Sequence, residues 1–374
     1  MGGRPRPVSE SVGRFYQVAD VETTKPACLS GLVFGADTRI LRSETSNKRQ
    51  TAMNHPTQPL NGDFGILIDQ VTPDDLADRD FQTWARDLWL KHGGLLGVRG
   101  KKLADLLPEQ LVRWSEVFGV IEDKIQTARE DKSVKGFPIL RIGNVKNEDG
   151  KIVAQLLQVP QLTSDADIRY NPETRRPVWH TDSTFRARPP VGSVFHCRKA
   201  PPEGAETLFA DMQGAYAALP PAERQKLDGL EAVCSLAHHD KKINSYSPHY
   251  PVLTPKQRKE NPPNRVPIVL NHPVTGRPSL YGLNSSTCAI VPKGQEVDPA
   301  DLDKWDLEGV EDDSVMIWRD MLPTVTGPDF TVKWQWQPGD VVVWDNRSTI
   351  HAGTGFDYSK YEREMWRLTL VAEA

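Results

Sequence analysis

The chain has 374 residues, of which 38% are apolar and 26% are charged, with a formal net charge of −4 and a pI near 6.2. This composition is typical of a globular protein with one large domain or two small ones. The small negative charge argues against a nucleic-acid partner or an anionic membrane surface. No apolar run is long enough to span a membrane, and no hydrophobic segment of a secretory signal follows the first basic residues.

Four cysteines are scattered along the chain without a Cys-x-x-Cys pair, at positions Cys28, Cys197, Cys234 and Cys288. Such spacing is typical of buried thiols in a reducing compartment, rather than of a disulfide framework or a cysteine metal site. We therefore expect a cytoplasmic protein.

The start of the chain is polar and contains many Pro, Ser and Thr residues, which predicts a loosely ordered N-terminal extension over residues 1–60. A single domain is expected over residues 61–374. Thr72 followed by Pro73 predicts the start of a helix, because Thr caps helix N-termini and Pro fits the first turn. Apolar residues then recur at helical spacing until Gly93, which predicts the end of that helix.

Later segments show either helical or alternating periodicity. Helices are predicted over residues 108–119, 211–219, 221–230 and 312–322. Strands are predicted over residues 65–69, 94–98, 137–142, 191–197, 266–270, 279–283, 331–337, 341–351 and 364–371. Many short strands between turns, with helices mostly before and between them, favour a mainly β fold with helical cover (α+β). We expect a jelly-roll barrel rather than a doubly wound sheet.

The segment Trp179–Phe185 carries the first chemical signal, because His180 and Asp182 are two residues apart. In an extended strand this spacing places both side chains on one face. An imidazole and a carboxylate are two of the three ligands in the two-His, one-carboxylate site of non-haem Fe(II) oxygenases. His351 follows a predicted strand and precedes Ala352-Gly353, which makes it the candidate third ligand. Taken singly, a histidine at such a position is more often structural.

A second His-x-Asp pattern, His238-His239-Asp240, lies beside Lys241 and Lys242. Two lysines would oppose a bound cation, so this pattern is expected to face solvent rather than bind a metal. The Pro-, Asn- and Lys-rich residues that follow predict a lid or binding loop over residues 240–265.

Two arginines, Arg363 and Arg367, are four residues apart, just before and within the last predicted strand. In an extended strand this spacing points both side chains to the same face. Burying two guanidinium groups is costly without anionic partners, and Arg binds carboxylates well in a bidentate manner. The alternative is a surface pair bonded to Glu362 and Glu364. The spacing alone does not choose between these interpretations.

Several motifs together resemble the taurine dioxygenase family of Fe(II)/2-oxoglutarate oxygenases, from about residue 62 to the end of the chain. The motifs are Trp-His-Thr-Asp-Ser-Thr-Phe at 179–185, Gly-Ala-Glu-Thr-Leu-Phe at 204–209, Trp-Gln-Pro-Gly-Asp at 336–340, Trp-Asp-Asn-Arg-Ser-Thr-x-His at 344–351, and the paired Arg363 and Arg367. They occur in the family's order and at similar spacing.

The resemblance implies a double-stranded β-helix, which is a jelly roll, and an Fe(II) site made by His180, Asp182 and His351. It further implies that Thr207 and Arg363 hold the distal carboxylate of the cosubstrate 2-oxoglutarate. O2 would be the second cosubstrate, and succinate and CO2 would be released. The second His-x-Asp pattern matches no family motif.

For the substrate, the resemblance assigns Arg367 to an anionic group. Ser183, which follows Asp182 in the motif, is a further candidate. Lys124 stands near the position of a sulfonate-binding His, and Arg176 stands where the taurine-using enzyme has Asn, so taurine itself is not expected. We expect a small anionic organic substrate: a carboxylate, an amino acid, a sulfonate or a phosphonate.

Two other function classes remain open from the sequence. A Zn(II)-dependent hydrolase could use the same three ligands, but it would give Arg363 and Thr207 no role. A catalytically silent jelly-roll binding protein would need no intact set of ligands. The sequence leaves open whether the chain forms a homo-oligomer.

Overall fold

The computed structural model describes residues 55–122, 132–154, 179–246, 252–283, 286–297, 320–357 and 359–372. All of them belong to one compact unit, Ser46–Ala374. The first strand, β1, spans Thr57–Asn61, so ordered structure begins before residue 61, where the domain was expected to start. The rest of the predicted N-terminal extension lies outside the described residues.

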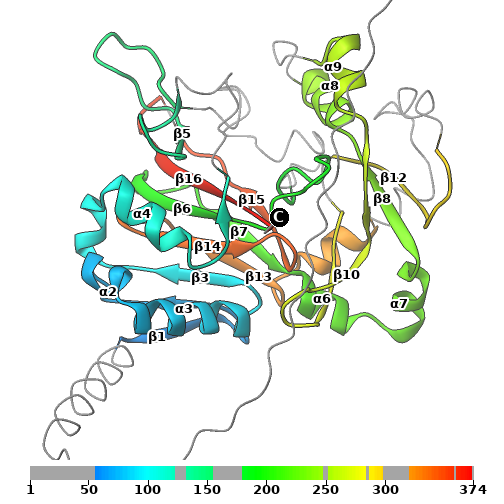
Figure 1. Cartoon of the computed structure of the whole chain (residues 1–374), viewed down its shortest axis with the longest axis horizontal. Helices are drawn as coiled ribbons and strands as arrows, with labels where there is room; N and C mark the ends of the chain where they lie inside the picture. The colour runs from blue at the N-terminus through cyan, green and yellow to red at the C-terminus, as the bar shows by residue number, and fades with distance from the viewer. Residues whose placement is uncertain are drawn as a thin grey trace, which may run out of the picture. The chain divides into compact units, whose positions relative to one another are not determined.

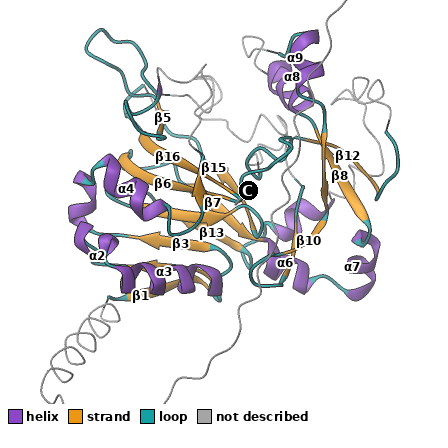
Figure 2. Cartoon of the chain, in the orientation of Figure 1, coloured by secondary structure: helices purple, strands orange, loops and turns teal. Residues whose placement is uncertain are grey.

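The described chain forms an α+β structure in which strands dominate (Figure 2). After β1, the strands are β2 Phe64–Ile68, β3 Leu95–Val98, β4 Val120–Ile121, β5 Leu140–Gly143, β6 Gly192–Lys199, β7 Thr207–Asp211, β8 Leu230–Cys234, β9 Asn264–Pro267, β10 Val269–Asn271, β11 Pro278–Leu280, β12 Thr287–Pro292, β13 Thr331–Trp334, β14 Val341–Asp345, β15 Thr349–Gly353 and β16 Glu364–Val371.

Helices lie mostly before and between these strands, as expected. They are α2 Pro73–Ala77, α3 Arg79–Lys91, the 3-10 helix η1 Lys101–Asp105, α4 Pro108–Ser115, α6 Met212–Ala218, α7 Pro221–Leu227, α8 Leu236–Tyr246 and α9 Pro255–Glu260. Residues 320–325 are also helical, while the predicted start of that helix at Asp312 lies outside the described residues.

The predicted helix over residues 72–93 is divided into α2 and α3. Thr72 caps α2 as expected, with its side chain accepting a hydrogen bond from the Asp75 N–H. The chain then leaves the helical conformation at Asp78, whose carboxylate accepts hydrogen bonds from the N–H groups of Asp80 and Phe81. This aspartate therefore starts a second helix, since Asp is a strong N-cap residue.

Two β-sheets form the centre of the fold. The larger has eight strands in the order β1-β2-β3-β14-β6-β16-β4, with β5 paired to β16, and the smaller has the order β13-β7-β15. Residues of β14 alternate between two cores: Val341 and Val343 pack with α2, α3 and α4, while Val342 and Trp344 pack with side chains of the smaller sheet. Helices α2, α3 and α4 thus cover the outer face of the large sheet (Figure 1). This period of two explains why the first four residues of β14, Val341–Trp344, are all apolar.

The chain changes sheets where the sequence predicted one continuous strand over residues 341–351. It turns at residues 346–348, so β14 belongs to the large sheet and β15 to the small one. Asp345 fixes this turn, because its buried carboxylate accepts two hydrogen bonds from the Arg347 guanidinium, at 2.9 and 2.6 Å. His272 Nε2 lies 2.9 Å from the same carboxylate.

The predicted loop over residues 240–265 is not an irregular loop. It contains the second half of α8, the whole of α9 and the start of β9, with residues 247–251 outside the described residues. The role of this segment as a lid stays a prediction. Among the described residues, no helix has the length and apolar character needed to cross a membrane.

Gly97 of β3 lies against the indole ring of Trp334 in β13, and this contact leads to a prediction about stability. A Cβ atom added at Gly97 would lie 2.1 Å from Trp334 Cη2. The indole cannot move easily, since its Nε1 donates to Asp340 Oδ2 at 3.2 Å and the Arg99 guanidinium lies 5.2 Å from its ring centre. We expect Gly97→Ala to reduce the free energy of unfolding by about 1–3 kcal/mol, the usual cost of overpacking a core.

Urea denaturation checks this expectation, with Gly119→Ala as the matched control. The nearest atom to an added Cβ at Gly119 is 3.6 Å away, which is ordinary contact. The control should unfold at the wild-type midpoint. Equal midpoints for both variants would contradict the packing argument.

Candidate active site

A backbone bridge between two distant segments brings the first two candidate ligands together. His180 and His351 form an isolated antiparallel bridge, in which the N–H of each donates to the carbonyl of the other at 2.9 Å. Their imidazole ring centres are 4.2 Å apart. The shared strand face considered for His180 and Asp182 is not what brings them together, because the chain turns at residues 182–185. Ser183 has a left-handed backbone, with φ of +48°.

The turn still places Asp182 beside both histidines. Ligand atoms of His180, Asp182 and His351 all lie within 4.8 Å of one another. His351 Nε2 is 3.8 Å from Asp182 Oδ1. When two ligand atoms each lie about 2.1 Å from one metal ion, the distance between them is about 3 Å for a right angle at the metal and about 4.2 Å for a straight one. Two imidazoles and one carboxylate with this spacing fit Fe(II), the metal expected from the sequence.

Asp182 is buried, and its charge is stabilised by several groups. Burial alone would raise the pKa of this carboxyl, but Arg367, His351, His180 and the Ser193 hydroxyl hold the pKa well below its usual range. Arg367 Nη2 lies 2.9 Å from Asp182 Oδ2, and Ser193 Oγ donates to the same oxygen at 3.0 Å. The carboxylate is therefore ionised at neutral pH and ready to bind a cation.

His351 is also in the form that binds metals. Burial and the neighbouring His180 lower its pKa to about 3, so the imidazole is neutral at physiological pH. Its Nδ1 atom is buried and has no hydrogen-bond partner in the part of the chain that the structure describes.

Arg363 and Arg367 both lie against the interior face of β6. Arg367 is opposite Phe195, with its guanidinium 6.0 Å from the phenyl ring centre, and Arg363 interacts with Cys197, two residues further along. The alternative of a surface pair with the neighbouring glutamates is wrong. Glu362 pairs with Lys199 and Glu364 pairs with Arg141, each at 2.8 Å.

The Arg363 guanidinium is a buried charge without a counter-ion in the described part of the chain. Burial lowers its pKa to about 10, so it remains protonated at neutral pH. Its Nε atom has no hydrogen-bond partner. Such an arrangement is costly unless an anion binds there.

Thr207, the other residue assigned to 2-oxoglutarate, is buried at the start of β7 and pairs with Gly353, two residues after His351. Its hydroxyl oxygen accepts a hydrogen bond from Trp336 Nε1 at 2.9 Å. The hydroxyl proton of Thr207 is therefore available for donation to a bound oxygen atom.

Some predicted site residues are not placed at the site. Lys124 and Arg176 lie outside the described residues. The second His-x-Asp pattern was expected to face solvent, but it lies on α8, where Asp240 is buried and His239 stacks on Phe185 with ring centres 6.4 Å apart. The expectation that this pattern faces solvent is therefore wrong.

Sequence reasoning missed two residues that hold the Asp182 turn. Ser193 contacts Asp182 directly. The sequence feature that could have indicated this role is that Ser193 is the one hydroxyl residue in the otherwise mostly apolar first half of β6. Asn264, at the start of β9, donates hydrogen bonds to the carbonyls of Thr184 and Arg186 at 2.9 and 2.7 Å. Nothing in the sequence around Asn264 indicates this contact.

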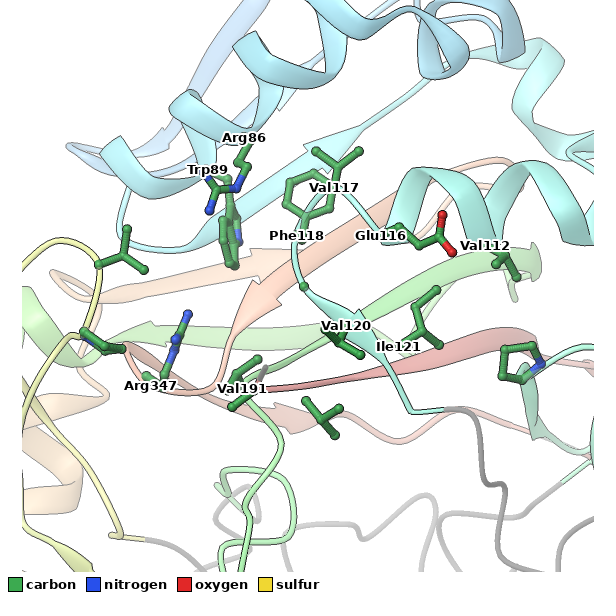
Figure 3. Close-up of a pocket in the computed structure, with 16 residues that line it drawn as sticks. Arg86, Trp89, Val112, Glu116, Val117, Phe118, Val120, Ile121, Val191 and Arg347 are labelled. Carbon is green, nitrogen blue, oxygen red and sulfur yellow. The ribbon is translucent and has the colours of Figure 1, made fainter. Parts of the chain in front are cut away.

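A groove of about 800 Å³ lies elsewhere, between helices α3 and α4 and the residues that precede and form β4 (Figure 3). It is lined mainly by apolar side chains, including Trp89, Phe118 and Val120. None of the three candidate ligands lines it, so it is separate from the candidate active site.

Comparison with known proteins identifies relatives over most of the chain. The family model described as "Taurine catabolism dioxygenase TauD, TfdA family" matches residues 56–369. An (S)-phenoxypropionate/alpha-ketoglutarate-dioxygenase from Delftia acidovorans is 30% identical over 313 residues, which cover 84% of this chain and 94% of the relative. An alpha-ketoglutarate-dependent 2,4-dichlorophenoxyacetate dioxygenase from Cupriavidus pinatubonensis is 29% identical over 326 residues, covering 86% and 99%.

Solved structures show the same fold. The crystal structure of AAD-2 in complex with Mn(II) and N-oxalylglycine has a TM-score of 0.64 at 22% identity, covering 86% of this chain and 98% of that chain. A putative alpha-ketoglutarate-dependent taurine dioxygenase from Burkholderia xenovorans has a TM-score of 0.60 at 24% identity, covering 86% and 93%. The predicted jelly roll with helical cover is confirmed. The extent of the family match shows that this chain belongs to the TauD/TfdA family of Fe(II)- and 2-oxoglutarate-dependent dioxygenases.

Proposed function

We propose that this dioxygenase oxidises a C–H bond of a small anionic organic substrate, with release of succinate and CO2. His180, Asp182 and His351 would hold Fe(II), because they combine the required donor set with ionised and neutral forms ready for metal binding. Bound Fe(II), with 2-oxoglutarate and O2, would supply the oxidising power. The chain's part is to bind and orient both organic molecules and to exclude water.

We assign the distal carboxylate of 2-oxoglutarate to Arg363 and Thr207. The buried guanidinium of Arg363, which has no counter-ion among the described residues, is the observation that carries this assignment, because a carboxylate would remove the cost of its burial. Thr207 would donate its hydroxyl proton to the same carboxylate, since its oxygen already accepts from Trp336. A Zn(II) hydrolase or a silent binding protein would leave this charge without a counter-ion.

The charge balance of the site favours an anionic substrate. Asp182 offsets one of the two charges of Fe(II), and dianionic 2-oxoglutarate offsets the other together with the charge of Arg363. The charge of Arg367 then remains. This side chain is only 16% exposed, and its Nε has no hydrogen-bond partner among the described residues. A carboxylate or sulfate group of the substrate would neutralise it.

The names of the relatives agree with this class. They include an (S)-phenoxypropionate dioxygenase and a sulfate ester dioxygenase from Pseudomonas putida, and both named substrates are anions. Ser183, Arg176 and Lys124 remain further candidates for substrate contacts. They were selected on sequence position alone.

The metal assignment predicts that His180→Ala abolishes succinate formation and Fe(II) binding while the fold stays intact. The reason is that two remaining ligands hold the ion too weakly. Succinate is measured with protein loaded anaerobically with Fe(II), metal content after gel filtration, and folding by circular dichroism. His238→Ala, in the second His-x-Asp pattern, is the control and should behave as wild type. Wild-type turnover by His180→Ala would refute the assignment.

The 2-oxoglutarate assignment predicts that Arg363→Met weakens binding of this cosubstrate. Hydrogen bonds to charged groups contribute about 1.5–3 kcal/mol, which corresponds to a roughly 10- to 150-fold higher Kd. Calorimetric titration of the Mn(II)-loaded protein with 2-oxoglutarate measures the effect. Arg141→Met, on the neighbouring strand β5, should leave the Kd unchanged because Arg141 pairs with Glu364. If Arg363→Met binds 2-oxoglutarate with the wild-type Kd, the distal carboxylate binds at another site and the assignment to Arg363 is wrong.

The substrate assignment predicts that an anionic compound stimulates succinate formation and that its neutral methyl ester does not. The panel comprises aryloxy acids, sulfate esters, sulfonates and amino acids, each beside a neutral analogue. We expect at least a tenfold preference for the anion, because the neutral analogue leaves the charge of Arg367 unbalanced. Equal stimulation by both members of a pair would exclude an anion-binding role.

A further inference from the structure

Ser193 is a fully buried hydroxyl in the middle of the large sheet. It lies on β6, opposite Trp344 of β14 and Thr369 of β16, so strands on both sides fix its backbone. Its Oγ donates to Asp182 Oδ2 at 3.0 Å and accepts from Arg367 Nη2 at 3.2 Å. Arg367 Nη2 also reaches Asp182 Oδ2 directly, at 2.9 Å. The three groups form a closed triangle of hydrogen bonds.

This triangle distinguishes the two oxygens of the Asp182 carboxylate. Oδ2 accepts from two donors, one of them charged, whereas Oδ1 faces His351 Nε2 at 3.8 Å. A carboxylate can bind a metal through one oxygen or through both. Binding through both would require Oδ2 to give up hydrogen bonds inside a buried site, which is costly.

We propose that Ser193 is a positioning residue, which holds Asp182 so that only Oδ1 binds the metal. This inference rests on the metal site of the proposed function. Ser193 suits the role better than Arg367 alone, because its short side chain has a single rotatable bond to the oxygen and stands on a strand paired on both sides. Arg367, with its long side chain, can then turn part of its guanidinium toward another anion without releasing Asp182.

The test compares Ser193→Ala with wild type in binding of Mn(II) alone, followed by the EPR signal of the free ion. Loss of an outer hydrogen-bond partner of a metal ligand typically costs 10- to 100-fold in affinity, and we expect a weakening in this range. The visible spectrum of the Co(II)-loaded protein gives a second readout. We expect its ligand-field bands to change for Ser193→Ala, because Asp182 would then be free to bind through both oxygens.

The matched control is Ser115→Ala. Ser115 is equally buried and its Oγ donates to the Leu111 carbonyl at 2.7 Å, but it lies on α4 and contacts no candidate ligand. This control should keep the wild-type Mn(II) affinity and Co(II) spectrum. If Ser193→Ala fails to fold, Ser193→Thr serves instead, since it retains the hydroxyl and should keep affinity within about threefold of wild type.

The possible failures are distinguishable. Wild-type protein that binds no Mn(II) would overturn the proposed metal site and this inference with it. Wild-type binding together with unchanged affinity and spectrum in Ser193→Ala would overturn the role of Ser193 alone. A Ser193→Thr variant that folds but loses affinity more than tenfold would also overturn it.

Discussion

The two backbone hydrogen bonds between His180 and His351 are the contact on which the site depends. His180 belongs to a turn-forming segment and His351 to β15 of the small sheet, so the two histidines come from elements far apart in the sequence. The bridge places the backbones of the two histidines side by side, and their imidazole ring centres are 4.2 Å apart. The turn that follows His180 brings Asp182 to the same place. Backbone pairing therefore brings the ligand-bearing segments together, and the side-chain torsions set the final ligand geometry.

The charged groups of the site lie where two apolar layers meet. Phe195 and Cys197 of the large sheet and Phe209 of the small one surround the space into which both arginines extend. In such surroundings each charge must be balanced by another, since water contributes little. Among the described residues, Arg367 has an anionic partner in Asp182 and Arg363 has none. Arg367 therefore contacts the metal site directly, whereas Arg363 does not.

Much of the architecture could be predicted because local signals and global packing agree. Three of the signals depend on neighbouring residues only: the capping residue Thr72, the apolar run of β14, and the two-residue spacing of His180 and Asp182. The errors arise where distant contacts override local pattern. Apolar continuity suggested one strand through residue 351, yet the distant His272 contacts the buried carboxylate of Asp345 where the chain turns into another sheet. In the same way, His239 of the Lys-flanked pattern lies against Phe185 of a distant segment.

Asn264 has a consequence for how this protein can change over evolution. Three residues separate Asn264 from the end of α9. Its side-chain amide donates hydrogen bonds to two carbonyls of the turn that begins at Asp182. The metal-bearing turn is thus attached to a strand that starts after the α8–α9 segment ends. The α8–α9 segment can gain, lose or exchange residues while Asn264, which follows it, stays bound to the carbonyls of Thr184 and Arg186. Changes in the length of the α8–α9 segment would therefore leave the attachment of the Asp182 turn to β9 in place.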